Sequence, residues 1–350
     1  MEGQGCNNTK KDKITAVVPC YNEEEVIELF YREICRVAEQ MSEQVDFEIL
    51  FVNDGSVDGT LEKMKELRRQ DKRVCYISFS RNFGKEAAMY AGLEHATGNL
   101  VAVIDADLQH PPKLLVQMYE SIRGEGYDSA AACRVSRKGE PKLRSFVSRK
   151  FYRVLAKLSK IEVVEGEVDY RLMSRQMVDA VLKMSERNRF TKGIFSWVGF
   201  HTKWIPYENV ERAAGKTKWS FWKLLKYSME GIIGFSTVPL ALVSIIGVLF
   251  CIGAFITIMY IIIKTIVWGD PVGGWPSLAC MVLGLCEFPL VPLPVRPSLA
   301  CMVLGVSGVQ LFCMGILGQY LGKIYLEVKN RPIYLASIVE MNDDDTAEIK

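Results

Sequence analysis

The stretch VAVIDADLQHPP, residues 101–112, decides the fold that the sequence predicts. Its first four residues are apolar and have the character of a buried strand, and Asp105 and Asp107 follow at once. A buried sheet tolerates carboxylates only at the end of a strand, so we expect this acid pair on the rim of a sheet. Because residues two apart in an extended segment project to the same side, the two acids can converge on one cation.

The acid pair predicts a metal site. Oxygen-only ligands select a hard cation, Mg²⁺ or Mn²⁺, which keeps coordination positions open for substrate phosphates. Gln109, and less strongly His110, are further candidate ligands. An Asp-x-Asp motif is also common by chance, and a solvated pair of turn acids is the alternative that the motif alone leaves open.

Short apolar runs alternate with amphipathic helical runs around this stretch. Strands are predicted at 14–20, 48–54, 74–80, 101–104, 129–134 and 201–212, and helices at 23–40, 58–69 and 85–95. This order predicts an α/β fold, with a mostly parallel sheet and helices on both faces. The carboxyl ends of its first four strands are polar, so one ligand pocket is expected at that edge.

The pocket suits a nucleotide whose sugar hydroxyls need acceptors better than it suits a dinucleotide. No G-x-G-x-x-G follows a predicted strand, and Gly84-Lys85 lacks the spacing of a P-loop. Glu23 and Asp54 are natural hydrogen-bond acceptors for a ribose or a base edge. Asp54 could equally be the acid that forms the turn before Gly55.

Composition sets broad limits on the class of protein. The 350 residues exceed the usual size of one domain. The formal charge of +2 says little as a total, but most of the charged residues lie in the first 230 residues. The ten cysteines form no C-x-x-C pair and there are only three histidines, so neither a zinc site nor a disulfide framework is indicated. Reduced thiols fit a protein that faces the cytosol, and the polar tail 1–12 does not resemble a secretory signal.

Six motifs, taken in order, resemble the family-2 inverting glycosyltransferases, and more narrowly the polyprenyl-phosphate glycosyltransferases. That subgroup includes the bactoprenol glucosyltransferases and the dolichol-phosphate mannose synthases. The motifs are VVPCYNEEE (17–25), VNDGSVDGT (52–60), SRNFGKEAAMYAGLEHATG (80–98), IDADLQHPP (104–112), DYRLMSR (169–175) and ERNRF (186–190). The resemblance implies a GT-A catalytic domain, a UDP- or GDP-linked sugar donor, Mg²⁺ or Mn²⁺, and a polyprenyl phosphate acceptor in the membrane. The product would be a polyprenyl-phosphate monosaccharide for modifying cell-envelope glycans.

The resemblance also assigns site residues. It places Asp105, Asp107 and Gln109 on the metal, and Asp169 beside the acceptor in the role of base. Because a phosphate monoester with a second pKa near ~6 is largely deprotonated already, we expect Asp169 chiefly to orient it. A cap on a following helix is the alternative for Asp169. The remaining assignments are Pro19, Tyr21, Glu23, Asp54, Asp105 and Lys85 for the nucleotide sugar; Asp169, Asp107 and Arg134 for catalysis; and Arg134, Arg137, Lys138, Arg212 and Lys218 for the acceptor phosphate.

A strongly basic segment follows the fifth predicted strand. Between Arg134 and Lys160 there are ten basic residues and one acid, Glu140, with apolar residues at helical spacing. Such a helix lies well against anionic headgroups, where each cation contributes about 1 kcal/mol. Nucleic-acid binding is the rival interpretation, but no aromatic platform or recognition motif supports it. Arg134, at a strand tip, is the best single candidate for binding a phosphate.

Two uncharged runs predict a hairpin of transmembrane helices. We divide the chain into a catalytic domain (13–215), a juxtamembrane segment (216–237), a first span (238–263), an outer loop (264–296), a second span (297–322) and a cytoplasmic tail (323–350). Lysines flank both spans on one side, which predicts a multi-pass protein of the cytoplasmic membrane, with its catalytic domain and both termini in the cytoplasm. The repeated PSLACMVLG, at 276–284 and 297–305, departs from the family pattern. We expect its second copy to enter the membrane, and its first, with the proline-rich segment that follows it, to form an enlarged outer loop or a shallow re-entrant piece.

Two other classes of function stay open. A processive polysaccharide synthase would need more spans and a Q-x-x-R-W motif, which ERNRF matches only in part. A non-enzymatic membrane scaffold would have no use for the metal pair. A second copy of the chain and a lipid-sugar flippase are candidate partners, and the sequence does not identify the sugar.

Overall fold

The computed structural model describes residues 11–135, 166–208, 236–268 and 297–342 of the chain. These residues form two compact units: Met1–Gly234 with Lys329–Lys350, and Phe235–Val328. Most of the predicted basic helix lies outside the described residues, as does the first copy of the repeat. Four predicted phosphate-binding residues also lie outside them, namely Arg137, Lys138, Arg212 and Lys218.

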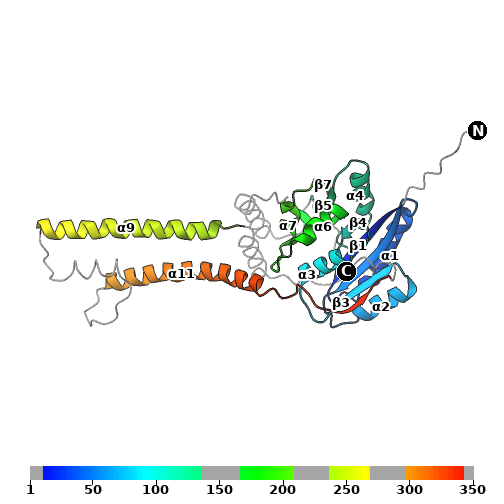
Figure 1. Ribbon diagram of the computed structural model, residues 1–350, viewed down its shortest axis with the longest axis horizontal. Coiled ribbons are helices and arrows are strands. Elements are labelled where there is room, and N and C mark those ends of the chain that lie inside the picture. Colours follow the sequence, from blue (N-terminus) through cyan, green and yellow to red (C-terminus); the bar gives the residue numbers. More distant parts are fainter. Residues whose placement is uncertain (1–10, 136–165, 209–235, 269–296, 343–350) are drawn as a thin grey trace, which may run out of the picture. The chain divides into compact units, whose positions relative to one another are not determined.

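One eight-stranded sheet forms the first unit (Figure 1), in the order β7-β5-β6-β4-β1-β2-β3-β8. Its strands are β1 Asp12–Cys20, β2 Val45–Asn53, β3 Val74–Phe79, β4 Leu100–Val103, β5 Ser129–Arg134, β6 Glu167–Ser174, β7 Thr202–Tyr207 and β8 Ala336–Glu340. The pairs β1–β2, β1–β4, β2–β3 and β5–β7 are parallel, whereas β6 and β8 run antiparallel to their neighbours. The mostly parallel sheet is therefore confirmed.

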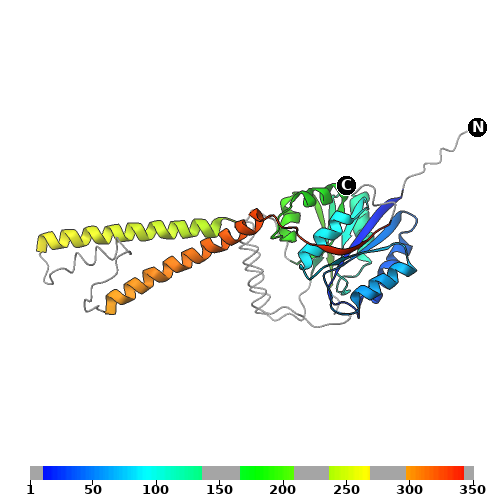
Figure 2. The same cartoon turned by 60° about the horizontal axis from the view of Figure 1, so that its bottom comes forward.

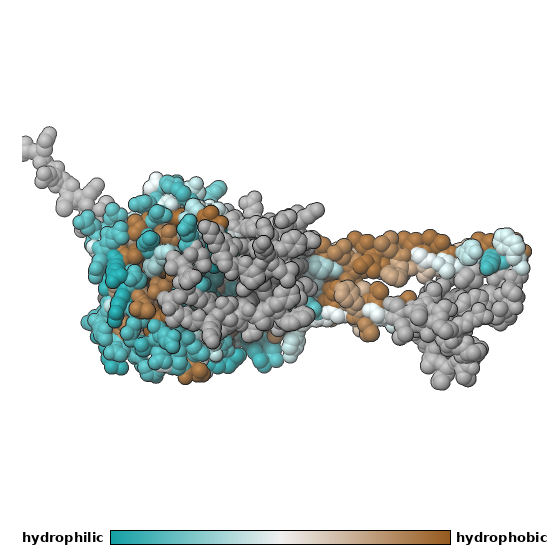
Figure 3. Space-filling model, turned by 180° about the vertical axis from the view of Figure 1, so that it is seen from behind, coloured by the Kyte–Doolittle hydropathy of each residue, from teal (hydrophilic) through white to brown (hydrophobic). Residues whose placement is uncertain are grey.

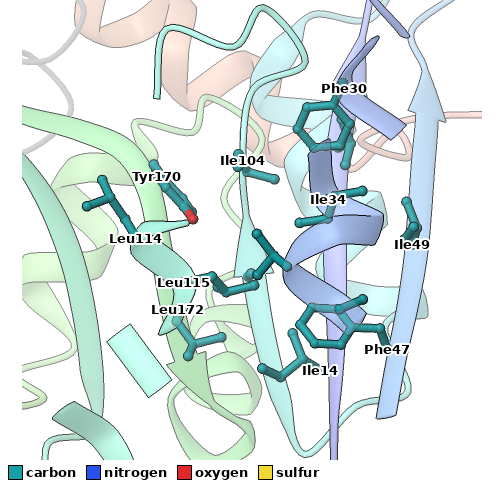
Figure 4. Packing of buried hydrophobic residues seen from close by; sticks show 14 of the residues in the cluster. Ile14, Phe30, Ile34, Phe47, Ile49, Ile104, Leu114, Leu115, Tyr170 and Leu172 are labelled. Atoms are coloured by element: carbon teal, nitrogen blue, oxygen red, sulfur yellow. The ribbon is translucent and has the colours of Figure 1, made fainter. Parts of the chain in front are cut away.

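Helices cover both faces of the sheet (Figures 1 and 2), as predicted. They are α1 Ile27–Gln40, α2 Thr60–Gln70, α3 Lys85–His95, α4 Leu114–Arg123, α6 Arg175–Lys183 and α7 Thr191–Trp197. On one face, α1, α2 and α4 share a core with alternate strand residues (Figure 4), including Ile14 and Ile49. On the other face α3 packs so closely that a Cβ on Gly92 would lie 2.1 Å from a methyl carbon of Val17.

The first helix begins later than predicted. It starts at Ile27 rather than at Glu23, because the carbonyl of Glu23 accepts the amides of Val26 and Ile27 in a turn. Asn22 has a positive φ of 54°, which reverses the chain directly after β1. Glu23 consequently stays in the loop at the edge of the sheet, where the sequence places a nucleotide pocket.

The second unit contains two long helices, α9 Val238–Trp268 and α11 Pro297–Val328, which contact one another. The phenol of Tyr320 donates to the carbonyl of Ser236 at 2.7 Å, so the end of α11 lies beside the beginning of α9. The described surface of both helices is largely hydrophobic (Figure 3). Within the described residues, one segment, Val238–Thr257, is long and apolar enough to cross a membrane. The start of α11 at Pro297, the first residue of the second repeat copy, agrees with proline's preference for the first helical position.

The segment after α11 differs from the tail that the sequence predicts. The helix continues to Val328, beyond the expected boundary at 323, and β8 then joins the sheet antiparallel to β3. The ring of Tyr334 stacks on Phe79 with 4.9 Å between centroids, and the amide of Ser80 donates to the carbonyl of Leu335. The chain thus leaves the first unit, passes through α9 and α11, and returns to complete the same sheet.

Candidate functional site

The carboxyl ends of β1, β2, β3 and β4 meet at one edge of the sheet, because these strands are parallel neighbours. Strand β6 enters this edge from the opposite direction. Its register pairs Val103 with Arg171, so Asp169, two residues before Arg171, lies beside Asp105, two residues after Val103. The topology thereby brings together two acids that are far apart in sequence.

Lys85, the first residue of α3, connects the two acids. Its Nζ lies 2.6 Å from Oδ1 of Asp105 and 2.6 Å from Oδ2 of Asp169. Lys192, in α7, approaches Oδ1 of Asp169 at 3.8 Å and donates to the carbonyl of Glu167. The site therefore holds two acids and two cations, and Lys192 is a member that the sequence did not predict. A lysine shortly after the ERNRF motif was visible, but nothing local indicated that α7 would bring it to β6.

The charges in this cluster determine the state of Asp169. Burial raises the pKa of this carboxyl, but Lys85 and Lys192 outweigh burial and hold the pKa well below 3.8. Likewise, burial lowers the pKa of Lys85, and the two acids more than reverse that effect. Asp169 is consequently ionised at neutral pH, and a carboxylate of such low pKa is a weak proton acceptor. The arrangement favours an orienting role, and because Asp169 lies within β6, the alternative of a helix cap is wrong. Ser174 is the residue that caps the following helix.

The side chain of His110 lies beside Asp105. Its Nε2 lies 4.0 Å from Oδ2 of Asp105, and its Nδ1 shares a 2.7 Å hydrogen bond with the hydroxyl of Tyr207. The ring also stacks on Tyr170 and is buried. Burial lowers the pKa of His110 in spite of the neighbouring acids. Arg134, at the end of β5, pairs with Tyr207 in the sheet and hydrogen-bonds to its side chain. Arg134 is thus connected to His110 through Tyr207.

Asp54 lies at the predicted edge but holds the protein's own backbone. Its side chain is buried, and it accepts the amides of Phe83 at 2.7 Å and Gly84 at 3.1 and 3.0 Å. Burial raises the pKa of Asp54, and these two amides act in the opposite direction. Asp54 therefore orders the turn that leads from β3 into α3 and places Lys85. Binding of the nucleotide by Pro19, Tyr21, Glu23 and Asp54 stays a prediction.

The residues present fit a hard divalent cation. Within the described residues, no group of three or more His, Cys, Asp or Glu side chains is arranged to hold a metal ion. Mg²⁺ is commonly held by one or two carboxylates together with substrate phosphates, so Asp105 and Asp107 can suffice. The ammonium of Lys85 lies against Asp105, so this carboxylate already has a cationic partner at the site. The carboxylate of Asp107 accepts the backbone amide of Gln109 at 3.1 Å, which fixes the local turn.

Comparison with known proteins gives consistent matches. Residues 15–182 match the family model "Glycosyl transferase family 2". A Bacillus subtilis glycosyltransferase is 41% identical over 97% of each chain. The SfII prophage-derived bactoprenol glucosyl transferase of Shigella flexneri is 40% identical over 92% of this chain and 97% of its own. The prophage bactoprenol glucosyl transferase homolog of Escherichia coli K12 is 39% identical over 94% and 99%.

Solved structures are more distant. Mannosyl-3-phosphoglycerate synthase from Rubrobacter xylanophilus is 18% identical, with a TM-score of 0.44 over 63% of this chain and 72% of its own. A mannosyltransferase from Pyrobaculum calidifontis, in complex with GDP-Man and Mn²⁺, is 17% identical, with a TM-score of 0.44 over 64% of each chain.

Proposed function

The chain belongs to glycosyltransferase family 2, and on that basis we propose that it transfers a hexose from a nucleotide sugar to a polyprenyl phosphate. The observation that carries the proposal is the cluster of Asp105, Lys85 and Asp169 at the carboxyl edge of the sheet. It occurs in a chain that is about 40% identical to bactoprenol glucosyl transferases along nearly its whole length.

The reaction is a single displacement. An oxygen of the lipid phosphate attacks the anomeric carbon from the face opposite the nucleotide diphosphate. The bond between that carbon and the diphosphate oxygen breaks, and the configuration inverts. The acceptor is largely deprotonated already, so the ionised Asp169, held by Lys85, orients it rather than removing a proton. No covalent bond to the enzyme is required.

Charge builds on the departing diphosphate, and cations of the site offset it. A divalent ion held by Asp105 and Asp107, with Gln109 as a further candidate ligand, would supply Lewis-acid stabilisation of that oxygen. Arg134 is the chain's own candidate for contacting a phosphate at the same edge, because it ends β5 and is held by Tyr207.

We further propose that α9 and α11 cross the cytoplasmic membrane as a hairpin. The apolar segment Val238–Thr257 supports the first crossing. Because residues on either side of the hairpin belong to the same folded unit, the chain must return to the side that it left, which favours a second crossing by α11. The catalytic unit and both termini would then face the cytoplasm. A reporter fused after Lys350 that appeared outside the cell would overturn this topology.

The test of the activity uses membranes that contain the full chain. They are incubated with polyprenyl phosphate and a panel of radiolabelled UDP- and GDP-sugars, and the lipid products are separated by chromatography. A labelled polyprenyl-phosphate monosaccharide is expected with the wild type and not with Asp107→Asn. Long polymer would favour a processive synthase, and the absence of any transfer would refute the proposal. A biological function that survived Asp107→Asn would favour a scaffold.

A further inference from the structure

A cavity of about 470 Å³ lies beside Lys85, within the first unit. Three parts of the chain form it: the turn from β3 into α3 with the first turn of that helix, the ERNRF motif, and the segment before β8. The lining residues are Arg81, Phe83, Gly84, Lys85, Glu86, Ala87, Arg187, Asn188, Arg189 and Ile333. This volume is in the range of small-molecule sites and exceeds what a phosphate group alone would fill.

The lining of the cavity is suited to an anion. It includes four cations, on Arg81, Lys85, Arg187 and Arg189, and one acid, Glu86. The carboxylate of Glu86 already accepts the amide of Thr191. The amino terminus of α3 adds the positive end of a helix dipole to the same wall.

One buried donor supports a ligand more directly. Arg189 is 8% exposed, and its guanidinium reaches the carbonyl of Val181 and the ring of Tyr90. Its Nε, however, is buried without a hydrogen-bond partner among the described residues. A buried N–H without a partner is costly, and a bound oxygen would remove that cost.

Apart from Lys85, the cavity is separate from the residues predicted to bind the donor. Neither Asp54 nor the acids Asp105 and Asp107 line it, nor do Pro19 and Tyr21. Lys85 alone of the predicted nucleotide-sugar residues belongs to the cavity, and its Nζ reaches the carboxylates of the reaction centre. A ligand here therefore adjoins the reaction centre while the donor pocket stays available.

The segment between α11 and β8 also lines the cavity, through Ile333. Ile333 follows the last residue of that helix, Val328, by five positions. The guanidinium of Arg187 holds this segment by donating to the carbonyls of Arg331 and Pro332. Ile333 thus contributes an apolar side chain to a cavity whose other lining residues include the four cations.

We propose that this cavity binds the phosphate group of the polyprenyl phosphate acceptor, an inference that rests on the proposed function. Guanidinium groups suit a phosphate because they can donate two parallel hydrogen bonds to its oxygens. The apolar Ile333 receives the first part of the prenyl chain. Lys85 then links the bound phosphate to Asp169, so that binding of the acceptor and its orientation share one residue.

The test compares two changes in one segment. Ile333→Asp places a carboxylate in the cavity, whereas Leu335→Asp makes the same change at an exposed position whose backbone carbonyl still accepts Ser80. We expect Ile333→Asp to raise the KM for farnesyl phosphate at least about tenfold, with an unchanged KM for the nucleotide sugar. Leu335→Asp should stay within about twofold of the wild type. Equal effects of the two variants, or none, would overturn the proposal.

A binding arm decides the question without turnover. Farnesyl phosphate, farnesol and inorganic phosphate are titrated into the purified full-length protein in detergent, and binding is measured by calorimetry. Farnesyl phosphate should bind the wild type at least about tenfold more tightly than it binds Ile333→Asp or Arg81→Gln. The affinity for farnesol should be the same in the wild type and in both variants. Arg81 is a second, independent probe because it stacks on Phe83 and, among the described residues, donates to the neighbouring carbonyl of Asn82.

The outcomes separate the two proposals. Inorganic phosphate that bound as tightly as farnesyl phosphate would indicate a site for the free anion and overturn the acceptor assignment. Specific binding of farnesyl phosphate without any glycosyl transfer would leave the cavity assigned and refute the proposed activity. Glycosyl transfer by the wild type, with acceptor binding unchanged in Ile333→Asp and Arg81→Gln, would support the proposed activity and refute the assignment of the cavity.

Discussion

Replacing Lys85 with methionine should uncouple the two acids of the site while preserving the fold. The side chain makes two charge-assisted contacts, each with 2.6 Å between Nζ and a carboxylate oxygen. Contacts to charged groups are worth roughly 1.5–3 kcal/mol when buried, and the side chain of Lys85 is 43% exposed, so solvent screening reduces each to about 1 kcal/mol. Loss of both amounts to about 2 kcal/mol, or a roughly 30-fold decrease in kcat/KM.

The pH dependence provides a second readout of the same change. With Lys85 present, the pKa of Asp169 is held well below 3.8, so this carboxylate is ionised throughout the neutral range. In Lys85→Met, burial still raises the pKa of Asp169, and Lys192 is the main remaining cation that opposes it. The pKa of Asp169 therefore rises, and the acid limb of the plot of kcat/KM against pH should move to higher pH.

The assay measures glycosyl transfer to polyprenyl phosphate in detergent at several pH values, with thermal unfolding as the check on folding. Lys63→Met is the matched control, because Lys63 is also ion-paired, to Glu28 at 2.9 Å, and lies on an exposed helix away from the site. We expect this control to stay within about twofold of the wild type. Activity of Lys85→Met within threefold of the wild type, with an unshifted acid limb, would refute the assigned coupling.

Three further predictions address the metal, the C-terminal segment and acid stability. Chelation with EDTA should abolish glycosyl transfer by the wild type, and added Mg²⁺ or Mn²⁺ should restore it. Asp107→Asn should stay inactive when metal is added, with an unchanged Tm. Transfer that does not depend on metal would contradict the metal site. Tyr334→Phe keeps the stacking on Phe79 but removes the 2.6 Å hydrogen bond to Glu94. It should therefore lower the free energy of unfolding, measured by urea titration, by about 0.5–1 kcal/mol. An unchanged urea midpoint would contradict that contribution. Burial raises the pKa of Asp12, but its hydrogen bonds, first among them that from Arg123, lower it below 3.8. The stabilisation by Arg123 should therefore be complete only above about pH 5 and should disappear as the pH falls through the lower pKa of the folded state. Arg123→Gln should accordingly be less stable than the wild type at neutral pH but not in strong acid, and a constant difference would count against this linkage.

The sequence predicted the elements whose evidence is local. The four parallel strands were predictable because each is a short apolar run that ends in polar residues, and the pocket followed from their shared direction. Strand β6 was missed because its polar residues, such as Glu167 and Arg171, obscure the pattern; the structure shows that these two side chains are buried as an ion pair at 2.6 Å. Strand β8 was missed because it is short and mostly exposed, and pairing with β3 is what makes it a strand.

The candidate site shows the same division. The motif indicated the acids at 105 and 107 because the apolar run before them places them just after a buried strand. The bridge through Lys85 was not predictable, since it depends on a turn held by Asp54 and on the antiparallel register of β6. Lys85 is separated by 20 positions from Asp105 and by 84 positions from Asp169. No periodicity in the sequence encodes contacts over such separations.

Because β8 pairs with β3, the sheet cannot be completed until the end of the chain has been synthesised. The hydroxyl of Ser337 donates to the carbonyl of Ser78, a contact between residues 259 positions apart. At about 5–20 residues per second, a ribosome needs roughly 10–50 s to supply the partner of β3 after that strand has been made. During this interval the nascent sheet carries an open edge, to which other chains can add. A product released before residue 336 would keep that edge open, so translation to the last strand protects the newly made enzyme from aggregation.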